Sequence, residues 1–346
     1  MSNFHDEIHA YESEKVNLSD TIRDDLYAKR QANRNRLKAH LPENIRISDS
    51  QFIPQGSMAV RTTVQEVGND YDIDDGVWFY EEDLRDALLG IFSKSVNDIQ
   101  KMICDALKDD KFNKQPEIHH NCVRVFYAEG YHVDVPAFRV FDAGTDKERQ
   151  ELAGENGWLA SDPTEINKWF EERIQELNNS ADGAGSQLRR MIRLLKRFAR
   201  SRGDKWDMPN GLKLTMLAEE CFKAVQDRDD EAFYNLLQSL KTRLDQNLVV
   251  YNRAQNKDLK DVLTKSLSDG NMIELRDHIG EALSELKSIT DDDCIKKSAR
   301  KAWEWVFQSD GFFKDYDDKQ DESDKKERIA FKEPSGPVVK SQTHFG

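Results

Sequence analysis

Long apolar runs are missing from this chain, and so is an apolar segment at its N-terminus. Across 346 residues no stretch approaches the length of about eighteen apolar residues that a membrane-spanning helix needs. The first residues, MSNFHDEIHAYESEK, lack the apolar core of a secretory signal peptide. We therefore expect a cytoplasmic protein without a membrane partner.

Paired cysteines and an excess of basic residues are missing as well. The four cysteines (Cys104, Cys122, Cys221 and Cys294) are scattered, with neither a Cys-x-x-Cys motif nor a paired histidine spacing. This pattern argues against a disulfide framework or a zinc site and favours reduced thiols in a core. The formal net charge is −14, whereas tight non-specific binding to a phosphate backbone requires a basic face. We do not expect a long nucleic acid as a partner, although a local basic patch can bind small phosphates.

What the chain does contain is a change of hydrophobic period along its length. Apolar residues make up 38% of the sequence, which is enough for a sizeable core. Residues 4–40 and 81–110 have the spacing of helices. Between residues 122 and 140 the period becomes two, and β-rich runs flank Ala128-Glu129-Gly130. This pattern predicts a hairpin with Asp134 in its second arm.

From Asp162 onward the pattern is helical. Asp162 can cap a helix whose first position is Pro163. Further helices are predicted at residues 186–201, 212–226, 229–248, 257–268, 272–288 and 294–308. Strands followed by helices predict an α+β lobe joined to a helical lobe.

The most informative segment is QGSMAVRTTVQEVGNDYDIDDGV, residues 55–77. If it contains a strand, Asp72 and Asp74 point to the same side, with α-carbons roughly 6.5 Å apart. Two carboxylates aimed at one point on a buried strand repel each other unless a cation compensates them. Magnesium, which prefers oxygen ligands, is a suitable cation. A third carboxylate from a neighbouring strand, for which Asp134 is the candidate, would complete a two-metal site.

From the acidic motif alone, a solvated turn is as good an interpretation as a metal-binding strand, because aspartate and glycine favour turns. Asp70 and Asp75 are interpreted as exposed or supporting residues. His119, His120 and His132 flank the predicted hairpin without the spacing of a metal site, so we assign them structural or exposed roles.

A second signal precedes the acidic residues. Gly56 and Ser57 follow the apolar run Phe52-Ile53-Pro54 and precede a predicted helix, MAVRTTV. A Gly-Ser turn between a strand and a helix offers backbone N–H groups and a hydroxyl to a phosphate. Most Gly-Ser pairs are ordinary loops, so the combination with the acidic residues is what makes the signal specific.

This combination resembles the polymerase-β-like nucleotidyltransferases. The strings QGSMAVRTTV, DYDIDDGV and LRRMIRLLKRFAR resemble more closely the CD-NTases, the bacterial cyclic-oligonucleotide synthases of antiphage signalling, over roughly residues 45–310. The resemblance implies a two-lobed α+β fold, with a mixed-sheet catalytic lobe packed on a helical C-terminal lobe. The expected parts are an N-terminal helical segment packing across both lobes (1–44), the catalytic core (45–160), the helical lobe (161–312) and a flexible charged tail (313–346).

The resemblance also implies roles for individual residues. Asp72, Asp74 and Asp134 would bind two Mg²⁺ ions, with Mn²⁺ as a possible substitute, and would carry the catalysis. Gly56 and Ser57 would hold the β- and γ-phosphates of the substrate. Gln55 would shape their turn.

The helix over residues 188–200 carries a basic stripe of Arg189, Arg193, Lys196 and Arg200. A solvated basic face explains most of these residues. Lys196 differs because it matches the family's helical lysine that reaches the triphosphate, and Arg193 is a weaker candidate for the same task. Asn210 stands where relatives often carry a serine that contacts the donor phosphates, which leaves that contact open.

The function implied by the resemblance is synthesis of a cyclic di- or trinucleotide second messenger from NTPs, with ATP, GTP or both as the expected substrates. The product is expected to activate a downstream effector. Gly346 is a candidate for conjugation by an E1/E2-like partner. Two alternatives stay open: a non-cyclising nucleotidyltransferase acting on protein or RNA, and a catalytically inactive nucleotide-binding scaffold. The fifteen-residue gap from Ser57 to Asp72 favours the cyclase. The presence of all three carboxylates, Ser57 and Lys196 argues against the scaffold.

Overall fold

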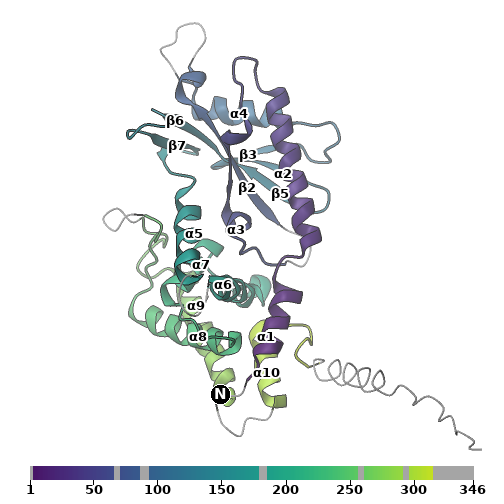
Figure 1. Ribbon diagram of the computed structural model, residues 1–346, viewed down its shortest axis with the longest axis vertical. Helices are drawn as coiled ribbons and strands as arrows, with labels where there is room; N and C mark the ends of the chain where they lie inside the picture. The colour runs from purple at the N-terminus through teal and green to yellow at the C-terminus, as the bar shows by residue number, and fades with distance from the viewer. Residues whose placement is uncertain are drawn as a thin grey trace, which may run out of the picture.

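The computed structural model describes residues 3–65, 71–85, 93–178, 185–255, 261–290 and 296–314. Figure 1 shows two lobes, one built around a sheet and the other made of helices. The strands are β1 (Phe52–Gln55), β2 (Asp72–Tyr80), β3 (Glu117–His119), β4 (Cys122–Phe126), β5 (His132–Val135), β6 (Ala137–Phe141), β7 (Arg149–Gly154) and β8 (Gly157–Ala160). The helices are α1 (His5–Tyr11), α2 (Asp20–His40), α3 (Gly56–Ala59), α4 (Val96–Leu107), α5 (Glu165–Asn178), α6 (Gly185–Arg200), α7 (Gly211–Cys221), α8 (Asp229–Gln246), α9 (Gly270–Glu285) and α10 (Lys296–Phe307). The predicted α+β fold is confirmed.

Within the described residues the strands form one mixed, eight-stranded sheet in the order β3-β4-β5-β2-β6-β7-β8, with β1 also paired to β2. The central strand β2 runs parallel to β5 and β6 and antiparallel to β1. The remaining pairs are antiparallel. The hairpin predicted across Ala128-Glu129-Gly130 is confirmed by the pairing of β4 with β5.

Side chains alternate along a strand, so the two faces of β2 lie in different environments. Ile73, Val77 and Phe79 are buried in the core of the sheet lobe, which α2 and α4 complete with leucine and isoleucine side chains. Asp75 points to this same face. It is only 2% exposed, and its carboxylate accepts hydrogen bonds from the guanidinium of Arg34 on α2, with the Nε bond at 2.6 Å. Of the two roles predicted for Asp75, an exposed position is therefore excluded and a supporting position remains. Asp70 lies outside the described residues.

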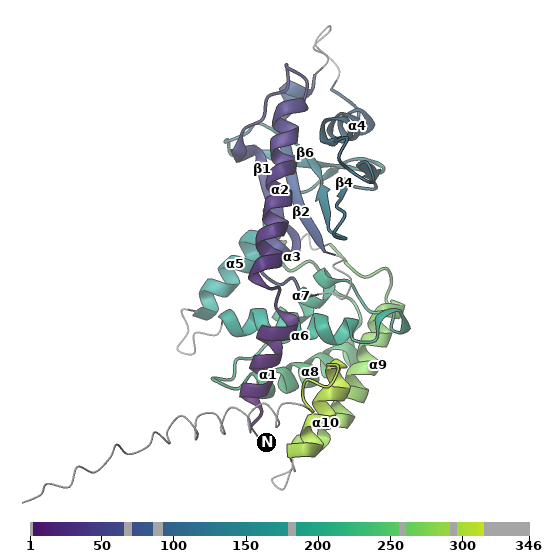
Figure 2. The ribbon, with the colours of Figure 1, turned by 90° about the vertical axis from the view of Figure 1, so that its right-hand side faces the viewer.

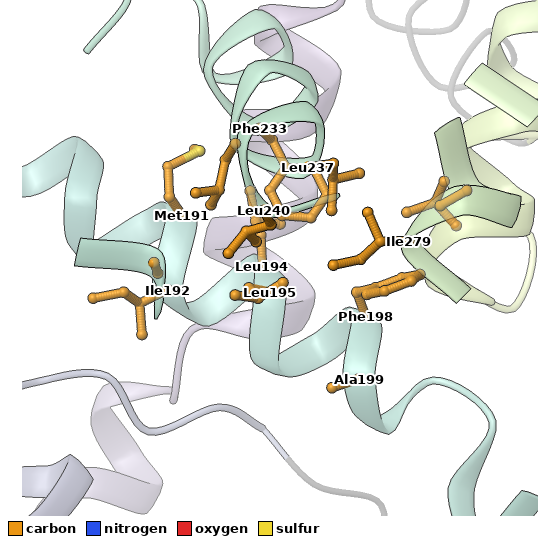
Figure 3. Close-up of a cluster of buried hydrophobic side chains, with 14 of the residues drawn as sticks. Met191, Ile192, Leu194, Leu195, Phe198, Ala199, Phe233, Leu237, Leu240 and Ile279 are labelled. Carbon is orange, nitrogen blue, oxygen red and sulfur yellow. The ribbon is translucent and has the colours of Figure 1, made fainter. Parts of the chain in front are cut away.

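The helical lobe has its own core, centred on α6. Leucine, isoleucine, methionine and phenylalanine side chains of α6, α8 and α9 interlock there (Figure 3). The residues include Met191, Ile192, Leu194, Leu195, Phe198, Phe233, Leu237, Leu240 and Ile279. Because α6 is buried on nearly all sides, it can hold a polar side chain rigidly against the other lobe.

The N-terminal segment contacts both lobes, as Figure 2 shows. Helix α1 packs beside α8, and Glu7 pairs with Arg300 of α10 through a 2.7 Å contact between Oε1 and Nη2. Helix α2 begins at the Ser19 cap and packs along α4 in the sheet lobe. We propose that the lobe boundaries follow the ranges set out above, with the junction between β8 and α5.

Several helix predictions need correction, and the helix predicted at 212–226 already ends at Cys221. The helix predicted for 81–110 is interrupted: Arg85 and Ser93 form an antiparallel bridge, and α4 begins only after the Ser95 cap. Residues 86–92 lie outside the described part. The helix predicted at 257–268 is wrong over residues 261–268, of which Asp261 and Leu263 form backbone hydrogen bonds with residues 250–252. Residues 257–260 are not described.

The predicted MAVRTTV helix is also wrong beyond its first turn. Helix α3 begins at Gly56 and ends at Ala59, and Arg61 adopts a positive φ of 60°. The N–H of Thr62 then donates to the carbonyl of Ser57 (2.8 Å), which closes a compact loop. Helix α5 begins at Glu165, two residues later than the prediction placed it.

Two further expectations concern the chain as a whole. Among the helices of the described part, none combines the length and the apolar character needed to cross a bilayer. The predicted tail, including Gly346, lies outside the described residues from position 315 onward.

Candidate active site

The acidic residues predicted as metal ligands lie next to one another on the sheet. In the parallel pairing of β2 with β5, Asp74 stands directly opposite Asp134. Asp72 precedes Asp74 by two positions and so projects from the same face. Because paired strands are about 4.8 Å apart, the three carboxyl groups share one small region. On the other side of Asp74, Gln55 of β1 occupies the matching position.

Burial and mutual repulsion make the charge on Asp74 unfavourable. Burial is the main cause that raises the pKa of Asp74 from 3.8 to about 6, and the negative charges of Asp134 and Asp72 add to it. Arg124 acts in the opposite direction and lowers this pKa. A bound cation would remove the penalty, so this part of the sheet favours cation binding.

The donor set suits a hard divalent cation, since three carboxylates supply only oxygen ligands. The side chains are not, however, arranged as a finished metal site: within the described residues no three acidic, histidine or cysteine side chains are grouped to hold one ion. Instead the carboxylate of Asp134 accepts two hydrogen bonds from Arg124 of β4, Nε to Oδ1 and Nη2 to Oδ2, each 2.7 Å long. The strand register brings the three carboxylates close enough for a metal site. Asp134 could bind a cation with both oxygens only after its hydrogen bonds to Arg124 are broken.

Arg124 and His132 are neighbours of the site that sequence reasoning missed or undervalued. The Nη2 of Arg124 is also 3.6 Å from Oδ1 of Asp72, and Nδ1 of His132 is 3.4 Å from the same oxygen. Arg124 could have been found by counting outward from the predicted turn, because 124 and 134 are equally far from Glu129. His119 and His120 have side chains that are 40% and 78% exposed, in keeping with the roles assigned to them.

The Gly-Ser turn lies against the acidic row, which is the set of Asp72, Asp74 and Asp134. Gly56 has a φ of +67°, and a β-carbon there would lie 2.0 Å from Oδ2 of Asp74. Both observations require glycine, since other residues rarely adopt this conformation and a side chain would displace the acid. The hydroxyl of Ser57 is hydrogen-bonded to Thr63 Oγ1 at 2.9 Å. Hydrogen bonds between Ser57 and both Thr62 and Thr63 thus fix the conformation of the turn.

Lys196 approaches the same turn from the helical lobe. It is 4% exposed, and its Nζ donates to the carbonyl oxygen (3.1 Å) and to Oγ1 (2.9 Å) of Thr62. Burial lowers the pKa of Lys196 to about 7, with a smaller contribution from the charge of Arg193. A buried ammonium group held by neutral oxygens is well suited to receive an anion.

Arg193, the weaker candidate for contact with the triphosphate, is not part of a solvated basic face. It is 8% exposed, its Nε pairs with the carboxylate of Glu12, and its Nη1 donates to the carbonyl of Arg61 at 2.8 Å. Its hydrogen bonds tie α6 to the N-terminal segment and to the loop after α3. This leaves Lys196 as the stronger candidate for contact with a triphosphate.

The three acidic residues, the Gly-Ser turn and Lys196 line one cavity between the lobes, with a volume of about 620 Å³. This is within the usual range for small-molecule sites. The lining includes each residue predicted for the site within the described part: Gln55, Gly56, Ser57, Asp72, Asp74, Asp134 and Lys196. Asn210 also lines it, and its side chain caps α7 by accepting from the N–H of Lys213 at 3.1 Å.

Comparisons with known proteins agree with this geometry. Residues 50–138 match the family described as "Cyclic GMP-AMP synthase DncV-like, nucleotidyltransferase domain". The chain is 25% identical over 221 residues to a cyclic GMP-AMP synthase of Escherichia albertii, an alignment that covers 61% of this chain and 46% of that protein. Residues 50–138 are thus similar to a DncV-like nucleotidyltransferase domain, and the chain is similar to a cyclic GMP-AMP synthase. The match thus spans about half the length of the curated relative.

Solved CD-NTase structures share the fold of both lobes. GTP-bound DncV of Vibrio cholerae superposes with a TM-score of 0.67 at 18% identity, covering 88% of this chain and 95% of DncV. CdnG of Bradyrhizobium diazoefficiens, in complex with GTP, gives a TM-score of 0.66 at 15% identity, covering 91% of this chain and 99% of CdnG. The similarity therefore includes the helical lobe as well as the matched domain, and the predicted resemblance is confirmed.

Proposed function

We propose that this chain is a CD-NTase that joins NTPs into a cyclic di- or trinucleotide and releases pyrophosphate at each step. The observation that carries the proposal is the single cavity that the three acidic residues, the Gly-Ser turn and Lys196 all line. Relatives support it, since V. cholerae DncV has been solved with GTP and with the linear intermediate pppA(3′,5′)pG. We expect ATP and GTP as the substrates of this chain.

Asp72, Asp74 and Asp134 would hold the divalent ions, for which Mg²⁺ is the expected species and Mn²⁺ a substitute. When bound, such ions lower the pKa of an attacking ribose hydroxyl and neutralise the leaving pyrophosphate. Asp74 would be ionised in this state, because a nearby cation offsets the burial and repulsion that raise its pKa.

The remaining residues would bind and orient the triphosphate. The backbone N–H groups after Gln55 and the hydroxyl of Ser57 can donate to phosphate oxygens. Lys196 would contact the triphosphate from the opposite wall, exchanging its hydrogen bonds to Thr62 for bonds to an anion. Orientation by both lobes would hold the phosphate in line with the attacking hydroxyl.

We further propose that the product is a second messenger of antiphage signalling in the cytoplasm and that it activates a downstream effector. Conjugation of Gly346 by an E1/E2-like partner stays a sequence-based proposal, because this residue lies outside the described part of the chain.

The test is incubation of the full-length protein with labelled NTPs and Mg²⁺, followed by phosphatase treatment and mass spectrometry. A phosphatase-resistant cyclic product that is lost in Asp72→Asn/Asp74→Asn supports the proposal. Asp105→Asn, an exposed position on α4, is the matched control and should retain the product. Label transferred to protein or RNA would instead indicate the non-cyclising nucleotidyltransferase, and no incorporation would indicate the inactive scaffold.

A further inference from the structure

The third acid of the site is already engaged by an internal cation. Arg124 of β4 and Asp134 of β5 are directly opposite each other in the antiparallel register. The guanidinium donates one 2.7 Å hydrogen bond to each carboxylate oxygen, which is the bidentate geometry of a strong charge-assisted pair. Both oxygens that could bind a divalent ion are therefore in use.

The position of Arg124 also affects the other two acids. Its Nη2 lies 3.6 Å from Oδ1 of Asp72, and its charge lowers the pKa of Asp74. A single guanidinium thus partly compensates all three carboxylates in the place where divalent ions would do so. Its side chain is 27% exposed, whereas that of Asp134 is 12% exposed, so Arg124 has access to solvent if it is displaced.

We propose that Arg124 is a built-in counter-ion that competes with the divalent cation for Asp134. This inference rests on the proposed function, because it assumes that Asp134 is a metal ligand. Without metal, Arg124 partly compensates the acidic row and occupies both carboxylate oxygens of Asp134. When a divalent ion binds, it takes over Asp134 and the guanidinium moves away, so Arg124 weakens the affinity of the site for metal.

A purely structural cross-strand pair is the alternative, and the same sheet contains a matched example. Arg139 of β6 stands opposite Glu151 of β7, and its Nε donates to Oε2 at 2.7 Å. Neither residue lines the cavity between the lobes, whereas Asp134 of the other pair does. Loss of this pair removes the same kind of contact without touching the acidic row, so Arg139→Gln is the control for Arg124→Gln.

The experiment measures Mn²⁺ binding to the full-length, nucleotide-free protein by electron paramagnetic resonance of the free ion. Arg124→Gln should bind Mn²⁺ about tenfold more tightly than wild type, the equivalent of one charge-assisted hydrogen bond that no longer has to be broken. Arg124→Lys, which keeps the charge but loses the planar fork, should bind with intermediate affinity. Arg139→Gln should bind as wild type does.

A second readout is thermal unfolding at increasing Mg²⁺ concentration. The metal-free Arg124→Gln protein should melt lower than wild type, and saturating Mg²⁺ should abolish the difference, whereas the loss in Arg139→Gln should be independent of Mg²⁺. Unchanged or weaker Mn²⁺ binding by Arg124→Gln would overturn the inference. If Arg124→Gln does not fold without metal, Mn²⁺ binding by Arg124→Lys is the test instead. An affinity of Arg124→Lys no higher than that of wild type would then overturn the inference.

Asp134→Asn separates this inference from the proposed function. If wild type binds Mn²⁺ in a manner that requires Asp134, but Arg124→Gln does not bind it more tightly, only the counter-ion role fails. If wild type and Asp134→Asn bind Mn²⁺ equally, the metal site itself is wrong, and both proposals fall.

Discussion

The cavity has an acidic wall on the sheet lobe, formed by Asp72, Asp74 and Asp134, and a helical wall on the other lobe, where Lys196 supplies the basic group. Burial disfavours the charged forms of Asp74 and Lys196. On the acidic wall the pKa of Asp74 is raised to about 6. On the helical wall the pKa of Lys196 is lowered to about 7. Each wall therefore contains an ionisable group whose charged form is less stable than it would be in water.

The walls also differ in how they satisfy these groups. The acidic row has a charged partner, Arg124, whereas Lys196 donates to the neutral oxygens of Thr62. One wall thus needs added positive charge and the other needs added negative charge. A divalent metal bound to a nucleoside triphosphate supplies both at once, which is why we regard the cavity as preorganised for that ligand.

The largest effect is expected from the acidic wall. Asp74→Asn removes a proposed metal ligand while keeping the side-chain shape, and product formation should fall about 1,000-fold or more, since metal-ion stabilisation supplies several kcal/mol. The measurement is the rate of pyrophosphate release from ATP and GTP. Retention of a tenth of the activity would show that the acidic wall is not the catalytic one, provided that Asp105→Asn is unaffected.

The turn that joins the two walls should give the next largest effect. In Gly56→Ala the new methyl group would collide with Asp74, from which it would lie 2.0 Å away. We expect about a 100-fold loss of activity, as small displacements of reacting groups commonly produce.

Gly144→Ala is the matched control for this change. Gly144 has a similar positive φ of +76°, but a β-carbon there would meet no atom within 4 Å. Both variants should lose stability because of the left-handed backbone, by about 1 kcal/mol. Equal activity in the two variants would exclude a special role for the contact between Gly56 and Asp74.

The helical wall should contribute mainly to substrate binding. Lys196→Met should raise the KM for NTPs about 10- to 30-fold with a smaller change in kcat, because it removes one charge-assisted contact to the triphosphate. Steady-state kinetics at saturating Mg²⁺ give both constants. A loss confined to kcat would instead mean that Lys196 acts on the transition state alone.

The two walls were unequally predictable from the sequence. The acidic row depends on strand alternation and on a short motif, so Asp72, Asp74 and their distant partner Asp134 could be selected from the sequence, although their catalytic roles stay predictions. The register of a hairpin with a short turn is local, so Arg124 could also have been placed opposite Asp134.

Contacts between the lobes were not predictable in this way. Thr62, the partner of Lys196, is 134 positions away from it, and only the packing of α6 against the loop after α3 brings them together. The same is true of Arg193, a weaker candidate for contact with the triphosphate, which is buried and paired with Glu12 of the N-terminal segment. Residues 261–263 pair with residues 250–252 instead of forming a helix, so a contact between chain segments outweighs local propensity there.

The smallest effects concern stability without ligand, and here the two walls should respond to pH in opposite directions. The pKa of Asp74 is higher in the fold, about 6, than its ordinary value of 3.8, so its ionised form destabilises the folded protein above pH 6, and this penalty disappears below about pH 4. Asp74→Asn should therefore raise the free energy of unfolding on the order of 2 kcal/mol at pH 8 and leave it unchanged at pH 4.

For Lys196 the sign is reversed. Its pKa is lowered from 10.5 to about 7, so the penalty is complete below pH 7 and fades as the pH rises toward 10.5. Lys196→Met should stabilise the ligand-free protein on the order of 1–2 kcal/mol at pH 6, after the loss of its hydrogen bonds to Thr62, and by less at pH 9. Lys213→Met is the control, because this buried lysine has an acidic partner, Asp269, 3.4 Å away, and its loss should destabilise the protein. Urea unfolding measures these changes, at pH 4 and 8 for Asp74→Asn and at pH 6 and 9 for the two lysine variants. A Lys196→Met protein that is less stable than wild type at pH 6 would contradict the inference that the charge of Lys196 costs stability in the absence of an anion.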